Sequence, residues 1–181
     1  VWFGDVGKNV REEFTIVKKG ENAGWSYFEG DIRTPGVTHT SMPGGSTPHK
    51  APLYTYPRSV GNSATGGIFY RGSELAPLSN RYVCGDYAQG QLWAIDRAGT
   101  VTTLPFSANG PVDFELDPVT GDIFVLEINS GTIKRITIQE GQADGFPSTL
   151  ADTGIFADLS DLSANPGVIP YEPNLTFWSD G

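Results

Sequence analysis

The sequence predicts an all-β fold built from repeated antiparallel meanders. Gly and Pro together make up about a fifth of the 181 residues, and long amphipathic helical windows are hard to find. Residues 66–96 contain three short strand-like runs, at 68–70, 81–84 and 91–96, separated by residues that favour turns. A second unit of this kind follows at 112–138. Two successive meanders of about 35–40 residues are typical of a β-propeller, in which such units repeat radially.

Shorter strands are expected ahead of these units. Apolar runs at 1–3, 14–17 and 25–28 predict three of them, and Gly4-Asp5 is expected to break the first. Residues 31–52 are rich in Gly, Pro, Ser and Thr and show no periodic pattern, which predicts a long surface loop. Strand character returns at 53–56, just before a proline.

The meander units supply the remaining strands. Ala98-Gly99 is expected to form a tight turn into a strand at 101–105, so that 66–105 provides the four strands of one antiparallel blade. In the second unit, strands are expected at 112–116, 123–128 and 132–138.

The composition changes after residue 140. Residues 141–181 contain six Asp and Glu, no Lys or Arg, and several prolines. We interpret 141–181 as a coil-rich, acidic linker and the start of a following domain, with a helical turn at 160–162. The chain begins within a strand and lacks an initiator Met, so we expect it to be a piece of a longer protein. An incomplete propeller would expose an unpaired sheet edge, and the isolated chain is expected to be poorly soluble or oligomeric.

Charge and hydropathy exclude several classes of partner. The net charge is −9, and no basic patch is present to attract nucleic acid or anionic lipid. No apolar run is long enough for a transmembrane helix. Cys84 is the single cysteine, which excludes an intrachain disulfide, and its apolar strand predicts a buried thiol. An acidic surface suits a soluble periplasmic or extracellular protein.

Several motifs occur together in a recognisable order. GDVG at 4–7 is followed by EE and by KKGENAGW, and then by SATGGIFYRG, YVCGDYAQGQLWAI and DFELDPVTGDIFVLEINSGTIKRI. In this order they resemble the glucose/sorbosone dehydrogenase family, and within it the branch that includes hedgehog-interacting-protein-like propellers. The resemblance implies a six-bladed β-propeller of which residues 1–140 form the C-terminal half. Many members use pyrroloquinoline quinone (PQQ) to oxidise a sugar at C1.

The resemblance also implies a metal and cofactor site. It places calcium between the carboxylate of Glu13 and the backbone carbonyl of Ala23, and carbonyl and carboxylate oxygens are ligands that Ca²⁺ prefers. It places the backbone of Gly7 and Lys8 where the family holds a calcium that bridges PQQ to the protein. The residues themselves leave two alternatives open: Glu13 as a solvated charge beside Glu12, and Gly7-Lys8 as a tight turn.

The sequence departs from the family where PQQ is held. PQQ is a tri-acid whose pocket normally offers Arg and Lys, whereas this chain has Asn109-Gly110-Pro111-Val112 and Tyr87-Ala88 at the matching places. Arg58 and Arg71 are candidates to replace these contacts, although Arg71 is expected on the surface after a strand. The family's catalytic His lies outside this chain, so the catalytic residues are unknown. His39 and His49 are expected to be loop residues without a role.

The remaining aromatic and acidic residues have structural interpretations. We expect the aromatic side chains to pack between blades rather than to stack on sugars; they are Trp2, Trp25, Trp93, Trp178, Tyr70, Tyr82 and Tyr87. Asp86 is expected to bond the backbone of its own turn.

Two functions follow as hypotheses. The first is part of a PQQ-dependent aldose dehydrogenase with a sugar substrate. Its electron acceptor is expected to be a c-type cytochrome, because the tail resembles a segment that follows propellers in large bacterial proteins carrying such domains. No Cys-x-x-Cys-His motif occurs in the chain itself. The second hypothesis is a non-catalytic propeller that binds protein or carbohydrate.

Overall fold

The computed structural model describes residues 1–45, 47–137, 156–158, 160 and 163–164. It divides the chain into two compact units, Val1–Thr137 and Ile138–Gly181, close to the boundary expected after residue 140. In the second unit, β13 (Phe156–Asp158) pairs antiparallel with β14 (Ser163–Ala164). The helical turn expected at 160–162 lies mostly outside the described residues. The assignment of 141–181 to a linker and a following domain stays a prediction.

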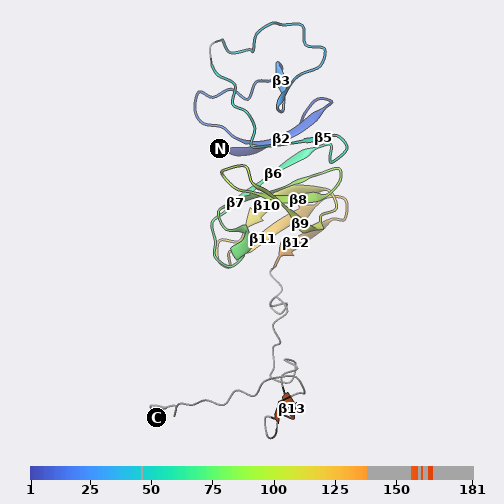
Figure 1. Cartoon of the computed structure of the whole chain (residues 1–181). Coiled ribbons are helices and arrows are strands. Elements are labelled where there is room, and N and C mark those ends of the chain that lie inside the picture. The colour runs from blue at the N-terminus through green and yellow to red at the C-terminus, as the bar shows by residue number, and fades with distance from the viewer. Residues whose placement is uncertain (46, 138–155, 159, 161–162, 165–181) are drawn as a thin grey trace, which may run out of the picture. The chain divides into compact units, whose positions relative to one another are not determined.

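Three antiparallel sheets follow one another along the first unit, from the blue strands to the orange strands in Figure 1. The first contains β1 (Trp2–Asp5), β2 (Arg11–Ile16) and β5 (Tyr54–Pro57). The second contains β6 (Ala64–Tyr70), β7 (Arg81–Asp86), β8 (Gln91–Ile95) and β9 (Val101–Ser107). The third contains β10 (Pro111–Leu116), β11 (Ile123–Glu127) and β12 (Thr132–Ile136). Strand β6 lies against both β1 and β10.

This arrangement is a partial, propeller-like β fold, which confirms the all-β prediction. Each sheet is a meander whose neighbouring strands pair antiparallel, as the turn residues predicted. Only the second sheet has the four strands expected of a blade; in the described residues the first and third have three. A hairpin of β3 (Phe28–Glu29) and β4 (Ile32–Arg33) is inserted between β2 and β5.

The second sheet depends on a glycine at its first strand pair. The register between β6 and β7 shifts between Thr65 and Ile68, and Gly67 lies within this irregularity. A Cβ atom at Gly67 would lie 1.8 Å from the backbone oxygen of Val83, so no other residue allows the two strands to approach this closely. The neighbouring Gly66 has no such contact.

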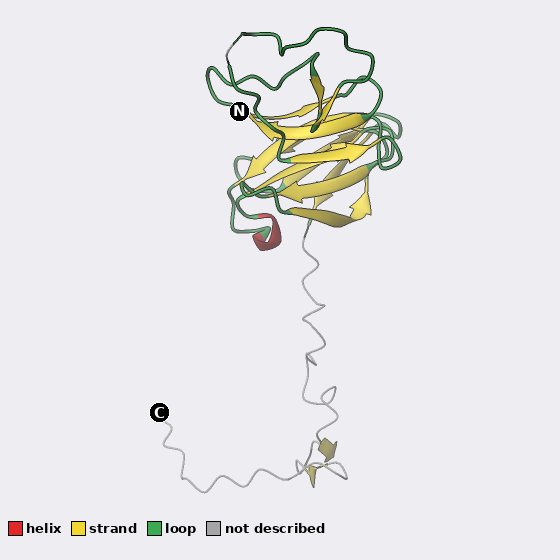
Figure 2. Cartoon of the chain, turned by 45° about the horizontal axis from the view of Figure 1, so that its top comes forward, coloured by secondary structure: helices red, strands yellow, loops and turns green. Residues whose placement is uncertain are grey.

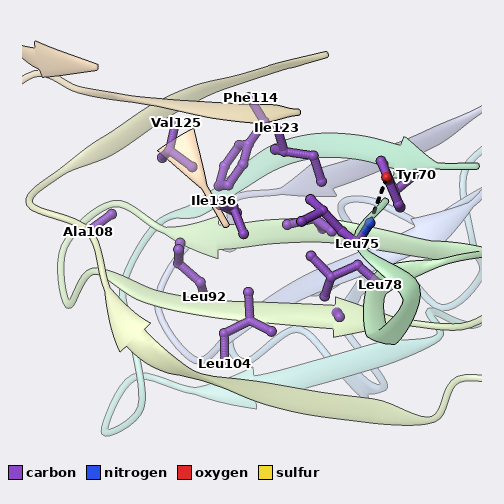
Figure 3. Packing of buried hydrophobic residues seen from close by; sticks show 12 residues of the cluster. Tyr70, Leu75, Leu78, Leu92, Leu104, Ala108, Phe114, Ile123, Val125 and Ile136 are labelled. Atoms are coloured by element: carbon purple, nitrogen blue, oxygen red, sulfur yellow. Dashed lines mark hydrogen bonds between the residues drawn. The ribbon is translucent and has the colours of Figure 1, made fainter. Parts of the chain in front are cut away.

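A hydrophobic core fills the space between the second and third sheets. Figure 3 shows Phe114 and Ile123 of the third sheet packed with Leu92 and Leu104 of the second. The hydroxyl of Tyr70 accepts a hydrogen bond of 3.0 Å from the backbone N–H of Leu75, which satisfies a buried polar group. The buried members of this core are Tyr70, Leu75, Leu78, Val83, Leu92, Ala94, Leu104, Ala108, Phe114, Ile123, Val125 and Ile136.

An aromatic core joins the first and second sheets. The ring of Trp93 lies 4.9 Å from that of Tyr56 and 6.0 Å from that of Phe14, measured between centroids. Trp2 stacks on Tyr82 at 4.9 Å, and Cys84 is fully buried here as a free thiol, as predicted. Packing between blades is therefore confirmed for these aromatic residues and for Tyr70 in the neighbouring core.

The same prediction is wrong for two aromatic residues. Trp25 is 54% exposed and Tyr87 is 38% exposed, because both lie in turns rather than in strands. The prediction for Trp178 stays open, since this residue lies outside the described residues.

Two expectations about the N-terminal strands are wrong. Strand β1 continues through Gly4 and Asp5, because Gly4 pairs with Phe14 and its missing Cβ leaves room for the Phe14 ring. The strand expected at 25–28 is largely a turn, because Gly24 has a φ of +96° and its carbonyl accepts the N–H groups of Tyr27 and Phe28.

Helical structure is minor in the folded unit. The short 3₁₀-helix η1 (Ala76–Leu78), red in Figure 2, lies between β6 and β7 and buries Leu78. Among the described residues, no helix has the length and apolar character needed to cross a membrane.

Candidate functional site

A pocket of about 390 Å³ lies at the end of the β1–β2 hairpin, within the size range of small-ligand sites. Its walls come from the ends of β1 and β2, from the turn between them, and from the segment that leads into β3. We call it the β1–β2 pocket. It is lined by Asp5, Val6, Gly7, Lys8, Glu13, Ala23, Trp25, Phe28, Glu29 and Gly30.

The four site residues that the sequence predicted all line this pocket. Gly7 and Lys8 lie in the β1–β2 turn, Glu13 lies on β2, and Ala23 lies in the turn before Gly24. The structure thus brings together residues from two separate segments of the chain. Their roles as ligands of calcium or PQQ remain predictions.

Glu29 holds the β1–β2 turn in place. Its Oε1 accepts backbone hydrogen bonds from Asn9, Val10 and Arg11 at 2.6, 2.6 and 3.1 Å. Burial raises the pKa of this carboxyl, but the three N–H donors outweigh burial and leave the pKa below its ordinary value. Gly7 is required in the turn, because an added Cβ would lie 1.5 Å from the backbone oxygen of Arg11.

Glu13 is a buried acid rather than a solvated one. Its side chain lines the pocket, the residue is only 6% exposed, and its Oε1 has no hydrogen-bond partner among the described residues. Burial, together with the negative charge of Asp5, raises the pKa of Glu13 to about 7. Burial also raises the pKa of Asp5. An acid in this environment is stabilised by a bound cation.

The carbonyl of Ala23 has a partner that the sequence did not predict. His49 Nε2 donates to this oxygen at 3.1 Å, and the imidazole stacks on Phe28 at 4.0 Å. His49 thus has a structural contact at the wall of the pocket that the sequence did not predict, while the expectation that it has no functional role stays a prediction. His39 lies elsewhere, with its ring 5.7 Å from that of Tyr27. Nothing in the sequence linked His49 to Ala23, which lies 26 positions earlier.

Arg58 is engaged within the protein. Its Nη1 forms an ion pair of 2.5 Å with Glu12, whose side chain is fully buried. Its Nη2 donates to the carbonyl of Gly7, and Nη1 also donates to the carbonyl of Asn62. Arg58 is thus no free contact for a cofactor acid. Arg71 is exposed and lies over the Phe69 ring at 5.2 Å, as expected for a surface residue.

The interpretation of Asp86 as a turn-bonding residue is confirmed and extended. Its Oδ1 accepts the N–H of Gln89 at 2.8 Å, within its own turn. Its Oδ2 accepts the hydroxyl of Tyr56 at 2.9 Å and the N–H of Ser63 at 2.8 Å. Asp86 therefore also links the second sheet to the first. Tyr87 lies outside the pocket and bonds Asn129 at 3.4 Å.

The residues of the pocket fit a metal ion between Glu13 and Ala23, but not at the backbone of Gly7. The unpartnered Oε1 of Glu13 and the carbonyl of Ala23 are hard oxygen donors that suit calcium. The Gly7 carbonyl does not fit, because a cation there would meet the positive guanidinium of Arg58. No cluster of three or more His, Cys, Asp or Glu side chains placed for a metal occurs within the described part of the chain.

PQQ does not fit the β1–β2 pocket. The pocket is lined by three acids, Asp5, Glu13 and Glu29, and by one basic side chain, Lys8. Such a lining repels a tri-acid and attracts a cation. Any contacts to PQQ would have to come from residues outside this pocket.

Comparison with known proteins supports the fold. No protein-family model matches the chain. The PQQ-bound form of aldose sugar dehydrogenase from Streptomyces coelicolor is similar in structure, with a TM-score of 0.50 and 15% sequence identity. The match covers 77% of this chain and 36% of that protein. The chain therefore shares its propeller-like fold with part of a PQQ-binding sugar dehydrogenase.

Proposed function

We propose that the chain is the calcium-binding part of a β-propeller of the PQQ-dependent sugar dehydrogenase type. The reaction that we assign to this propeller is oxidation of an aldose at C1. The observation that carries the proposal is the β1–β2 pocket, where Glu13, with an unpartnered buried oxygen, lines the same space as Ala23. The shared fold supports the sugar dehydrogenase type.

In this proposal the chain's own residues hold the metal. The carboxylate of Glu13 and the carbonyl of Ala23 would bind calcium, and water would complete the six to eight oxygen ligands that calcium takes. His49 positions the Ala23 carbonyl through its hydrogen bond. The calcium would fix the segment around Ala23 to β2 and so shape this end of the propeller.

Calcium is expected to stabilise the protein, and Glu13→Gln is expected to remove most of this effect. At calcium concentrations of 100 times Kd, calcium binding is expected to raise the free energy of unfolding of the native protein by about 2.7 kcal/mol. The substitution preserves the size of the side chain but removes the charge that attracts the ion. Thermal melts with calcium and with EDTA measure the gain. Glu74→Gln, an exposed acid outside the pocket, serves as control. An unchanged calcium effect in Glu13→Gln would refute the site.

A second candidate is a non-catalytic propeller that binds protein or carbohydrate. Two observations favour it: the guanidinium of Arg58 on the Gly7 carbonyl, and the acidic lining of the pocket. Both oppose the binding of PQQ through a calcium at Gly7 and Lys8.

Calorimetry with PQQ separates the two candidates. The natural full-length protein, titrated with PQQ in the presence of calcium, is expected to bind one equivalent if it is an enzyme. Sugar oxidation with a dye acceptor should then appear only in the PQQ-loaded protein. Absence of PQQ binding, with calcium binding intact, would overturn the enzyme proposal and leave the non-catalytic propeller.

A further inference from the structure

Asp5 and Glu13 face each other across the β1–β2 pair. They are direct register partners in the antiparallel ladder, and both line the β1–β2 pocket. Direct cross-strand partners have Cβ atoms about 4.5–5.5 Å apart on the same face of a sheet. Two like charges in this position destabilise the pair unless something neutralises them.

The other acids near Glu13 have partners within the protein. Glu12 pairs with Arg58, Asp31 pairs with Arg11 at 3.4 Å, and Glu29 accepts three backbone N–H groups. Glu13 also accepts a backbone hydrogen bond from Gly30, but within the described structure neither Asp5 nor Glu13 has a basic partner. In the described residues, no Lys or Arg forms an ion pair with either of them, although Lys8 lines the same pocket.

One carboxylate oxygen of Glu13 is buried without a hydrogen-bond partner. The residue is more than nine-tenths buried, and its Oε1 lacks a hydrogen-bond partner within the described structure. A buried carboxylate oxygen that lacks a partner is costly. Because Asp5 lies opposite Glu13 in the same pocket, a cation bound to the Glu13 carboxylate is within reach of Asp5 as well.

We propose that Asp5 is a third protein ligand of the calcium, together with Glu13 and the Ala23 carbonyl. This inference rests on the proposed calcium site and adds to it the residue that faces Glu13. Two carboxylates and a carbonyl form a hard oxygen set, and calcium tolerates their irregular geometry better than magnesium, which demands an octahedron. The ion then joins β1, β2 and the segment before β3, and it neutralises the like-charged pair.

The test is Asp5→Asn, which keeps the shape of the side chain and removes its charge. Loss even of outer-shell partners lowers metal affinity by about 10- to 100-fold, so loss of a ligand is expected to lower calcium affinity by at least about tenfold. Calorimetry with CaCl₂ measures the change. Without calcium, Asp5→Asn is expected to melt at or above the temperature of the native protein, because the repulsion with Glu13 is relieved.

Asp31→Asn is the matched control. It removes the same charge close to Glu13, but Asp31 is paired with Arg11 and does not line the pocket. We expect it to change calcium affinity less than about threefold, since only its contribution to the negative field is lost. A loss as large as that in Asp5→Asn would mean that general charge, not ligation, is responsible, and would overturn the inference.

Terbium provides a second readout that does not depend on activity. Tb³⁺ substitutes for calcium, and its emission is sensitised by a nearby tryptophan; Trp25 lines the pocket. Sensitised emission in the native protein that weakens in Asp5→Asn supports the inference.

Calcium titrations of the variants distinguish the role of Asp5 from the existence of the calcium site. If Asp5→Asn keeps native affinity while Glu13→Gln loses binding, Asp5 is no ligand and the calcium site remains. If the native protein itself binds no calcium, both proposals fail.

Discussion

Replacing Gly67 by alanine is expected to destabilise the folded unit by on the order of 3 kcal/mol. The new Cβ would lie 1.8 Å from the Val83 oxygen, which is backbone and has no rotamer to change. Strands β6 and β7 would have to separate at the first strand pair of the second sheet. Both hydrophobic cores use residues of this sheet, so the effect reaches the whole unit. Urea unfolding followed by tryptophan fluorescence, to which the buried Trp93 contributes, measures the loss.

Gly66→Ala is the matched control for this prediction. Here the nearest atom to an added Cβ is the Tyr82 hydroxyl at 3.5 Å, which is an ordinary contact, and the backbone of Gly66 has no positive φ. Alanine restricts the unfolded chain, so the control is expected to gain about 0.4–1 kcal/mol. Equal stability of the two variants would contradict the close approach of β6 and β7.

Arg58→Ala is expected to destabilise the unit by about 3 kcal/mol. Arg58 is the ionic partner of Glu12, whose side chain is fully buried, and removing the guanidinium leaves that carboxylate without its counter-charge. The variant also frees the carbonyls of Gly7 and Asn62. Arg71→Ala serves as control: Arg71 is exposed, its guanidinium lies over the Phe69 ring, and its loss is expected to cost less than about 1 kcal/mol. Chemical denaturation at pH 7 compares the two.

The stability of Arg58→Ala is also expected to depend on pH. Burial raises the pKa of Glu12, and the Ala64 N–H and the charge of Arg58 counteract this rise. Without Arg58 the pKa of Glu12 rises further, so the folded state holds a proton that the unfolded chain has released. Stability is then highest below the ordinary Glu pKa and falls as pH rises through the raised value. Arg58→Lys, which keeps the charge, should recover part of the loss, and a pH-independent deficit in Arg58→Ala would argue against this explanation.

Part of the candidate site could be predicted from the sequence. Gly7, Lys8, Glu13 and Ala23 were identified by resemblance to a family, and the structure places them around one pocket. Asp5 was not identified, because its relation to Glu13 arises from strand register. A break at Gly4-Asp5 was expected instead, and this error concealed the pairing.

The sequence by itself determined the fold class and the order of the strands. Turn residues such as Ala98-Gly99 act within a few positions, so the β8–β9 hairpin and its neighbours can be predicted locally. Tertiary structure decided the electrostatics of the site. Arg58 meets Gly7 across 51 positions, because β5 pairs with β2 in the first sheet. His49 meets Ala23 across 26 positions, because the two ends of the inserted segment form a bridge at Asn22 and His49. Burial, which raises the pKa of Glu13 to about 7, is likewise a property of the folded chain, because it depends on which distant residues exclude water from the carboxylate.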